Sequence, residues 1–98
     1  MHSRQEIMSW ITLSEHDIRA LGLRRLALFG SAARGESTEK SDLDFLVGFE
    51  RKSFDSYMGL KELLEQMFSC HVDLVLADSI KPRLRPIILS EAVHAPGF

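Results

Sequence analysis

The sequence predicts a small α/β (α+β) domain in which helices flank a small mixed β-sheet. Three observations predict this fold class. Short apolar runs of strand length alternate with segments of helical periodicity. Glycine, proline and serine residues separate these segments where turns are expected. The length of 98 residues, with 45% hydrophobic and 27% charged residues, suits one compact domain over residues 1–98.

The beginning of the chain is expected to be helical. Residues 5–12 carry a weak helical pattern, which fits either a short helix or a loose N-terminal arm over residues 1–12. Ser14 is a candidate N-cap, with Glu15 and Asp17 in the first turn of a short helix that stops at Gly22. The core that carries the candidate site residues is expected over residues 23–93.

Strands and helices are expected to alternate over the rest of the chain. Residues 23–29 predict a strand that ends at Gly30, followed by a short helix over residues 31–34 that Gly35 closes and by a polar loop over 36–41. Residues 43–49 and 71–76 predict two further strands. A last helix begins between Pro82 and Pro86, and a short edge strand is expected at 92–94. Between the second and third strands, residues 56–69 predict the main amphipathic helix, on the helical spacing of Tyr57, Leu60, Leu63, Leu64, Met67 and Phe68.

Composition and apolar run length argue against several classes of protein. The net charge of −2 and the pI near 6.0 disfavour direct binding of nucleic acid, which usually requires a basic face. The single cysteine, Cys70, has no partner for an internal disulfide and no zinc-ligand spacing around it, so we interpret it as a packing residue. No apolar run approaches the roughly 18 residues that span a bilayer. The sequence therefore predicts a cytoplasmic protein with no membrane partner.

Acidic residues interrupt two of the predicted strands. Side chains alternate along a strand, so Asp42 and Asp44 project from the same face, opposite Leu43 and Phe45. Asp73 stands alone among apolar residues in the third strand. Carboxylates that converge on one surface repel each other by about 4 kcal/mol per pair at 4 Å and an effective dielectric constant of 20. A divalent cation such as Mg²⁺ is the natural counter-charge, although two solvated carboxylates at the end of an edge strand are the alternative.

A possible phosphate-binding turn precedes the acidic pair. A strand that ends in Gly30-Ser31 and turns into a helix directs backbone N–H groups and a hydroxyl outward, and glycine allows a phosphate to approach closely. Arg34 lies one helical turn after Ser31 and is a candidate for the same anion. A Gly-Ser pair alone is a weak signal, but an acidic pair in the following strand makes it a strong one.

These residues together resemble a known family. The run Gly30-Ser31-Ala32-Ala33-Arg34-Gly35, followed by Asp42-Leu43-Asp44 and by Asp73, resembles the signature of the DNA polymerase beta-like nucleotidyltransferase superfamily. The short length, the Arg34-Gly35 pair and the tail around Glu91 resemble its minimal, MNT-type branch, and the resemblance covers residues 23–93. One departure is Ala32, where members of this branch often carry a basic residue.

The resemblance implies a polymerase beta-like fold, a two-Mg²⁺ mechanism and ATP as substrate. Asp42, Asp44 and Asp73 would bind the metal ions, while Gly30, Ser31 and Arg34 would hold the nucleotide. Asp73 would either help to bind the second Mg²⁺ or accept the proton of the attacking hydroxyl itself. The implied partner is a HEPN-domain toxin, onto which this antitoxin would transfer AMP, on a tyrosine. Two alternatives remain at this point: a non-catalytic antitoxin that acts by binding alone, and a nucleotidyltransferase that modifies a small molecule such as an aminoglycoside.

Several other polar and aromatic residues are set aside. His16, His71 and His94 are not spaced as a metal site, and we expect surface or packing roles for them. Lys40 is interpreted as a solvated loop residue rather than a phosphate ligand. Trp10 and Phe98, near the ends of the chain, are expected to pack or to contact a partner.

Overall fold

The computed structural model describes residues 3–36, 42–51 and 53–98. Lys40 and Ser41, together with most of the polar loop predicted over 36–41, lie outside these residues. The chain begins with two helices and continues through strands and helices in the order α1 (Arg4–Leu13), α2 (Glu15–Ala20), β1 (Leu23–Phe29), β2 (Leu43–Phe49), α3 (Phe54–Phe68), β3 (Val72–Leu76), η1 (Ala77–Ser79), α4 (Arg85–Glu91) and β4 (Val93–His94).

The four strands form one mixed sheet in the order β3-β2-β1-β4. β1 pairs antiparallel with both β2 and β4, whereas β2 pairs parallel with β3. Because α3 connects β2 to β3, the parallel pair has the helical crossover that such a pair requires. The predicted fold class, a small mixed sheet flanked by helices, is confirmed.

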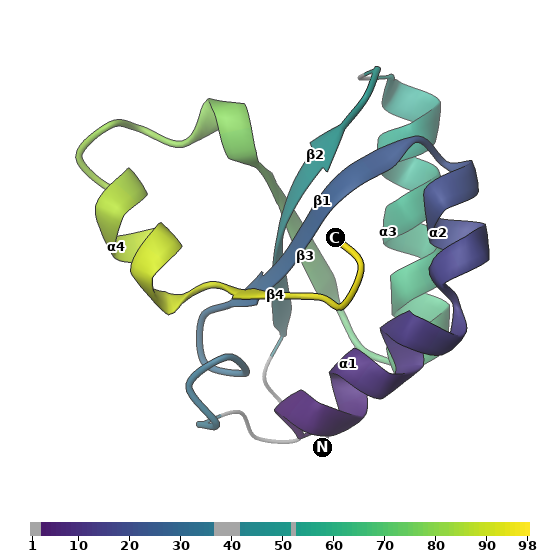
Figure 1. Cartoon of the computed structure of the whole chain (residues 1–98), viewed down its shortest axis with the longest axis horizontal. Helices are drawn as coiled ribbons and strands as arrows, with labels where there is room; N and C mark the ends of the chain where they lie inside the picture. Colours follow the sequence, from purple (N-terminus) through teal and green to yellow (C-terminus); the bar gives the residue numbers. More distant parts are fainter. Residues whose placement is uncertain (1–2, 37–41, 52) are drawn as a thin grey trace.

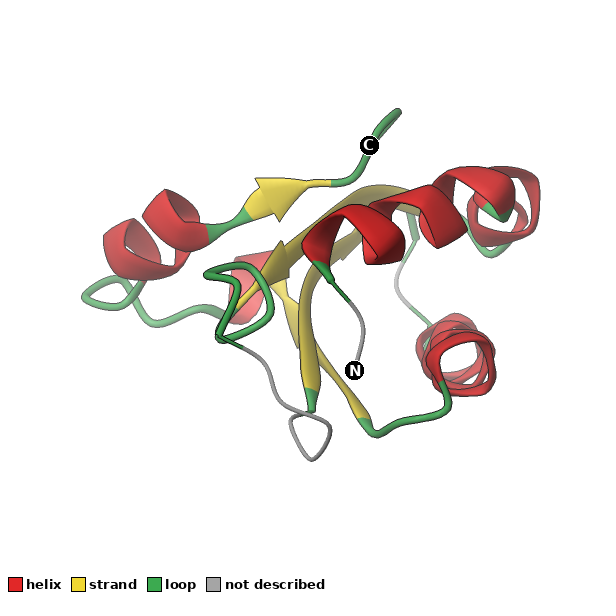
Figure 2. Ribbon diagram, turned by 90° about the horizontal axis from the view of Figure 1, so that it is seen from below, coloured by secondary structure: helices red, strands yellow, loops and turns green. Residues whose placement is uncertain are grey.

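The helices α1, α2 and α3 gather on one side of the sheet, and α4 lies apart on the other side (Figures 1 and 2). The core lies between the sheet and the first group, because Leu43, Phe45 and Val47 of β2 are fully or almost fully buried. The ring of Phe45 stacks on that of Phe68 from α3, with the ring centroids 6.3 Å apart. Alternation along β2 therefore turns Asp42 and Asp44 toward the face that these three helices leave open.

The N-terminal segment is a helix of the core. In α1, Ser3 caps the first turn by accepting a hydrogen bond from the backbone N–H of Glu6 at 3.1 Å. Ile7 and Ile11, one turn apart, have no exposed surface. Of the two predictions for residues 5–12, a short helix is the one that the structure shows, over Arg4–Leu13.

The other differences from prediction are small. Residues 31–34 form a turn rather than a helix, closed by hydrogen bonds from Arg34 N–H to the Gly30 carbonyl and from Glu36 N–H to the Ser31 carbonyl. Ser14 occupies the N-cap of α2, but its side chain makes no capping hydrogen bond. Cys70 is half-buried and packs against the core, as expected. Among the described residues, no helix has both the length and the apolar character needed to cross a bilayer.

Candidate active site

Strand pairing brings Gly30, Asp44 and Asp73 into a row across the sheet. Asp44 pairs with Asp73 in the parallel register of β2 and β3, and with Phe29 in the antiparallel register of β1 and β2. Gly30 directly follows Phe29 at the end of β1. Three segments that are far apart in the sequence therefore place the glycine turn and two carboxylates at one end of adjacent strands.

Gly30 and Asp44 are in close contact. The backbone of Gly30 has a φ of +76°, in the left-handed region that glycine adopts at little cost. A Cβ atom at this position would lie 2.6 Å from Oδ2 of Asp44, which is closer than real contacts allow. The turn therefore requires glycine for two separate reasons: its backbone conformation and the space that the carboxylate occupies.

Asp44 is the carboxylate of this row that is less exposed to solvent. Burial is the main cause that raises the pKa of Asp44 above its ordinary value, and the negative charges of Asp73 and Asp42 raise this pKa further. His71 and Arg34 act in the opposite direction. Carboxylates that disfavour each other's ionised form, and that offer hard oxygen donors, fit a site for a divalent cation.

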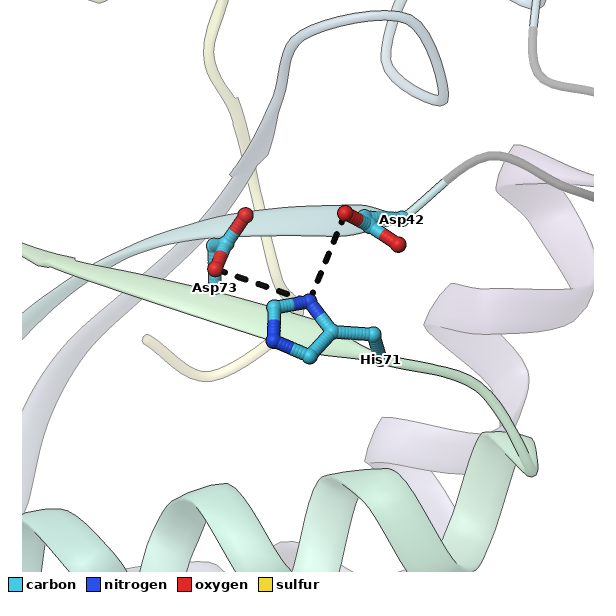
Figure 3. A group of neighbouring side chains, drawn as sticks. All are labelled: Asp42, His71 and Asp73. Atoms are coloured by element: carbon cyan, nitrogen blue, oxygen red, sulfur yellow. Dashed lines mark ion pairs between the residues drawn. The ribbon is translucent and has the colours of Figure 1, made fainter.

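A second group of ligand atoms lies beside Asp44. Nδ1 of His71 is 3.4 Å from Oδ2 of Asp42 and 3.6 Å from Oδ1 of Asp73 (Figure 3). One ligand atom from each of these three residues lies within 4.8 Å of the other two. All three side chains are about half exposed, so the group opens to solvent.

His71 is a site residue that sequence reasoning missed. The spacing of the histidines along the chain does not indicate a metal site, so the sequence alone does not mark His71. Its place follows from the β2–β3 register, in which Leu43 pairs with Val72, so that the preceding residues Asp42 and His71 are also neighbours. In addition, the backbone N–H of Leu43 donates to the His71 carbonyl at 3.1 Å. His16 and His94 are exposed on α2 and β4, as expected.

Arg34 lies beside the site but is already paired. Its guanidinium donates to carboxylate oxygens of Glu36 and Glu91, both at 3.0 Å. The bond to Glu91 connects the glycine turn to α4, and a bond of 3.1 Å from Arg4 to the Ala33 carbonyl connects the turn to α1. Ala32 is buried in the core cluster, so the departure from the family pattern falls on a packing position.

Polar side chains of α3 hold the backbone of β3. The Val72 N–H donates to Oε2 of Glu65 at 3.1 Å, and Nζ of Lys61 donates to the Val72 carbonyl at 2.6 Å. The Tyr57 hydroxyl donates to the Leu74 carbonyl at 3.0 Å. Since Val72 lies between His71 and Asp73, the two bonds to Val72 hold the backbone between these two side chains.

Comparisons with known proteins indicate the family of the chain. Residues 15–94 match the nucleotidyltransferase domain family. The chain is 38% identical over 96 residues to the protein adenylyltransferase MntA of Thermococcus cleftensis, an alignment that covers 96% of this chain and 97% of the relative. It is 46% identical over 76 residues to a Methanocaldococcus jannaschii protein whose name proposes the same activity, covering 74% of this chain and 76% of that protein.

Solved structures show the same fold. One described as that of a minimal nucleotidyltransferase superimposes with a TM-score of 0.73 at 37% identity, covering 92% of this chain and 89% of the other. A toxin–antitoxin structure with AMP-PNP also gives a TM-score of 0.73, at 23% identity, covering 93% of this chain and 73% of the other. A third, of a tri-AMPylated Shewanella oneidensis HEPN toxin with its MNT antitoxin, gives 0.58 at 22% identity, covering 89% and 72%. The family match over most of the chain, the near-complete alignment with MntA and the shared fold lead to one conclusion: the chain is an enzyme of the nucleotidyltransferase domain family and one of its minimal, MNT-type members.

Proposed function

We propose that this protein transfers AMP from ATP to a hydroxyl group, on a tyrosine, of a partner HEPN-domain toxin, and so acts as the antitoxin. The observation that carries the proposal is the row of Gly30, Asp44 and Asp73 across β1, β2 and β3, with Asp42 beside it. This row joins a glycine turn, whose backbone a phosphate can approach closely, to carboxylates suited to a divalent cation.

Each residue of the row has a proposed role. Gly30 and Ser31 hold the β- and γ-phosphates, with the Arg34 guanidinium at the edge of the turn. Asp42, Asp44 and Asp73 would hold two Mg²⁺ ions, and these ions would supply the positive charge that neutralises the phosphates and lowers the pKa of the attacking hydroxyl. In the reaction, the acceptor oxygen forms a bond to the α-phosphorus of ATP while the bond from that phosphorus to pyrophosphate breaks. In an alternative role, Asp73, which is half exposed on the edge strand, would itself accept the proton that the hydroxyl loses instead of helping to hold the second Mg²⁺.

The relatives support a protein acceptor. The Thermococcus cleftensis relative is named a protein adenylyltransferase, and the solved neighbours include a HEPN toxin that carries AMP in complex with its MNT antitoxin. The exposure of the site in this chain points the same way. Asp42, His71 and Asp73 are each about half exposed. In the described part of the chain, the surface that these three side chains form is therefore open to a second molecule, such as the acceptor protein.

The proposal is tested by mass spectrometry on the cognate HEPN partner. With Mg²⁺ and ATP, the wild-type protein should add one AMP or a few to the partner, on a tyrosine. The variant Asp44→Asn should still bind the partner but fail to label it, because the shielded carboxylate of the metal site is lost. Asp17→Asn, on the exposed first turn of α2, is the control and should label normally.

The same experiment separates the other candidate functions. A partner that is neutralised but never gains mass, with saturating Mg²⁺ and each of the four common nucleoside triphosphates, would contradict the enzymatic proposal and leave a binding-only antitoxin. Transfer to an aminoglycoside without any protein partner would instead favour a small-molecule enzyme.

A further inference from the structure

We infer that Asp42, His71 and Asp73 form a binding site for a divalent transition-metal ion of the Zn²⁺ or Co²⁺ type, with Nδ1 of His71 as one ligand. The inference deepens the proposed function, because Asp42 and Asp73 belong to both sites and the ion would compete there with Mg²⁺. It concerns which metal ion the site prefers, and it can be tested without any AMP transfer.

The first reason to expect a transition-metal ion is the chemical type of the donor atoms. Two carboxylates alone favour hard cations such as Mg²⁺, whereas an imidazole nitrogen favours Zn²⁺ and the other late divalent ions of the first transition row. Nδ1 of His71, rather than its other ring nitrogen, faces both carboxylates (Figure 3). The group therefore offers one nitrogen and two oxygen ligands, which is the kind of set that holds a zinc ion with an open fourth position.

The second reason is the distance between the donor atoms. Ligand atoms about 2.1 Å from a tetrahedral ion lie about 3.4 Å apart, whereas adjacent ligands of octahedral Mg²⁺ lie about 2.9 Å apart. The observed distances from Nδ1 of His71 are 3.4 Å to Asp42 and 3.6 Å to Asp73. These two distances fit the wider spacing of a tetrahedral site, and the two carboxylate oxygens lie within 4.8 Å of each other.

The backbone under the group is fixed. The His71 carbonyl accepts the Leu43 N–H, the Val72 N–H donates to Glu65, and the Val72 carbonyl accepts from Lys61. A site built on paired strands with restrained backbone needs little rearrangement to bind an ion. Asp44 is not part of this group, so its carboxylate remains available to a nucleotide-bound Mg²⁺.

The inference is tested by titrating untagged, metal-free protein with Co²⁺ and recording the visible absorption spectrum. We expect one bound Co²⁺ with the intense bands of a four-coordinate site, displaced by equimolar Zn²⁺ but not by equimolar Mg²⁺. His71→Ala should weaken Co²⁺ binding roughly tenfold or more, since even the loss of an outer-shell partner costs a metal site that much. His94→Ala, which removes an exposed histidine of β4, should bind as the wild type does.

The contrary results are equally clear. Equal Co²⁺ affinity and equal spectra for wild type and His71→Ala would mean that His71 only pairs with the two carboxylates, and displacement of Co²⁺ by equimolar Mg²⁺ would remove the metal preference. His71→Gln serves as a second variant, and circular dichroism of each variant confirms the fold. A protein that never transfers AMP but binds Co²⁺ as expected would overturn the proposed function and leave this inference intact.

Discussion

At the scale of single residues, Gly30 and Asp44 constrain each other. Asp44 is held close to the turn by the register of β1 and β2, and the space beside Gly30 is filled by its carboxylate. A phosphate that approaches the Gly30 backbone therefore also approaches Asp44, with a metal ion needed between the two negative groups. One glycine thus couples the turn at the end of β1 to the carboxylate row.

The substitution Gly30→Ala tests this coupling. The added methyl group would lie 2.6 Å from Oδ2 of Asp44, so the carboxylate would have to move, and a misplacement of about 1 Å at an active site costs on the order of 100-fold in rate. We expect a loss of AMP transfer of that order, measured as the rate of partner labelling. Stability should fall by about 1–2 kcal/mol from the left-handed backbone alone.

Gly22→Ala is the matched control for that loss. Gly22 also has a positive φ, of +84°, but a Cβ atom there would meet no atom within 4 Å. It should lose a similar free energy of unfolding and keep a normal labelling rate. Equal labelling rates for the two variants would show that Gly30 has a purely structural role.

The sequence marks Asp73 as a candidate site residue but does not mark His71. Asp73 could be selected from the sequence because an acidic residue inside an apolar run is unusual. His71 stands just before its strand, where a polar residue is ordinary, so nothing local marks it. Only the pairing of β2 with β3 brings it to Asp42, and pairing between distant strands cannot be deduced from local patterns.

At the scale of elements, α3 acts on the edge of β3 through a polar stripe. Tyr57, Lys61 and Glu65 follow one another at intervals of one helical turn and bind backbone groups of Leu74 and Val72. β3 lies at the edge of the sheet, so these backbone groups have no neighbouring strand to bind. The stripe thus protects an edge strand and fixes the peptide between His71 and Asp73.

The substitution Glu65→Ala tests the function of the stripe. Without the carboxylate, the Val72 N–H loses its acceptor, so its amide hydrogen exchange should accelerate and the rate of AMP transfer should fall. Glu65→Gln should keep most of both properties, because the amide oxygen accepts the same hydrogen bond. The bond from Val72 lowers the pKa of Glu65, so its stabilising effect is present at neutral pH and is lost as the pH falls through that lowered pKa.

Glu62→Ala, an exposed position on the same helix, is the control and should change neither measurement. Slow Val72 exchange together with a normal transfer rate in Glu65→Ala would show that the stripe does not position the site.

Some ends of helices and strands were predicted to the residue, and others were not. The strands β1 and β2 begin and end as predicted, because apolar runs are bounded by glycine and charged residues. α3 begins at Phe54, two residues before the predicted start, because Ser53 caps it by accepting the Ser56 N–H at 3.0 Å. Phe54 and Asp55 are exposed, so they add nothing to the apolar periodicity on which the prediction depended.

At the scale of the whole molecule, α1 connects the core to the site. Its apolar face packs into the core through Ile7 and Ile11, and Arg4 at its beginning donates to the Ala33 carbonyl in the glycine turn. The sequence does not decide between a helix and a loose arm for residues 5–12, because their apolar pattern is weak. Only the burial of this segment against other elements reveals its role. A protein of this size has a small stability reserve, so each helix of the core matters.

A pair of substitutions on α1 tests whether this helix is part of the core in solution. Ile7 has no exposed surface, and we expect Ile7→Ala to lower the free energy of unfolding by roughly 2–5 kcal/mol through lost burial and the cavity left behind. Leu13→Ala removes an aliphatic side chain of similar size from the same helix, but this side chain is 82% exposed, so its effect should stay within about 0.5 kcal/mol. Chemical denaturation followed by circular dichroism measures both values. Two equally small losses would mean that α1 is not packed in solution, and the loose arm would then be the better description of this segment.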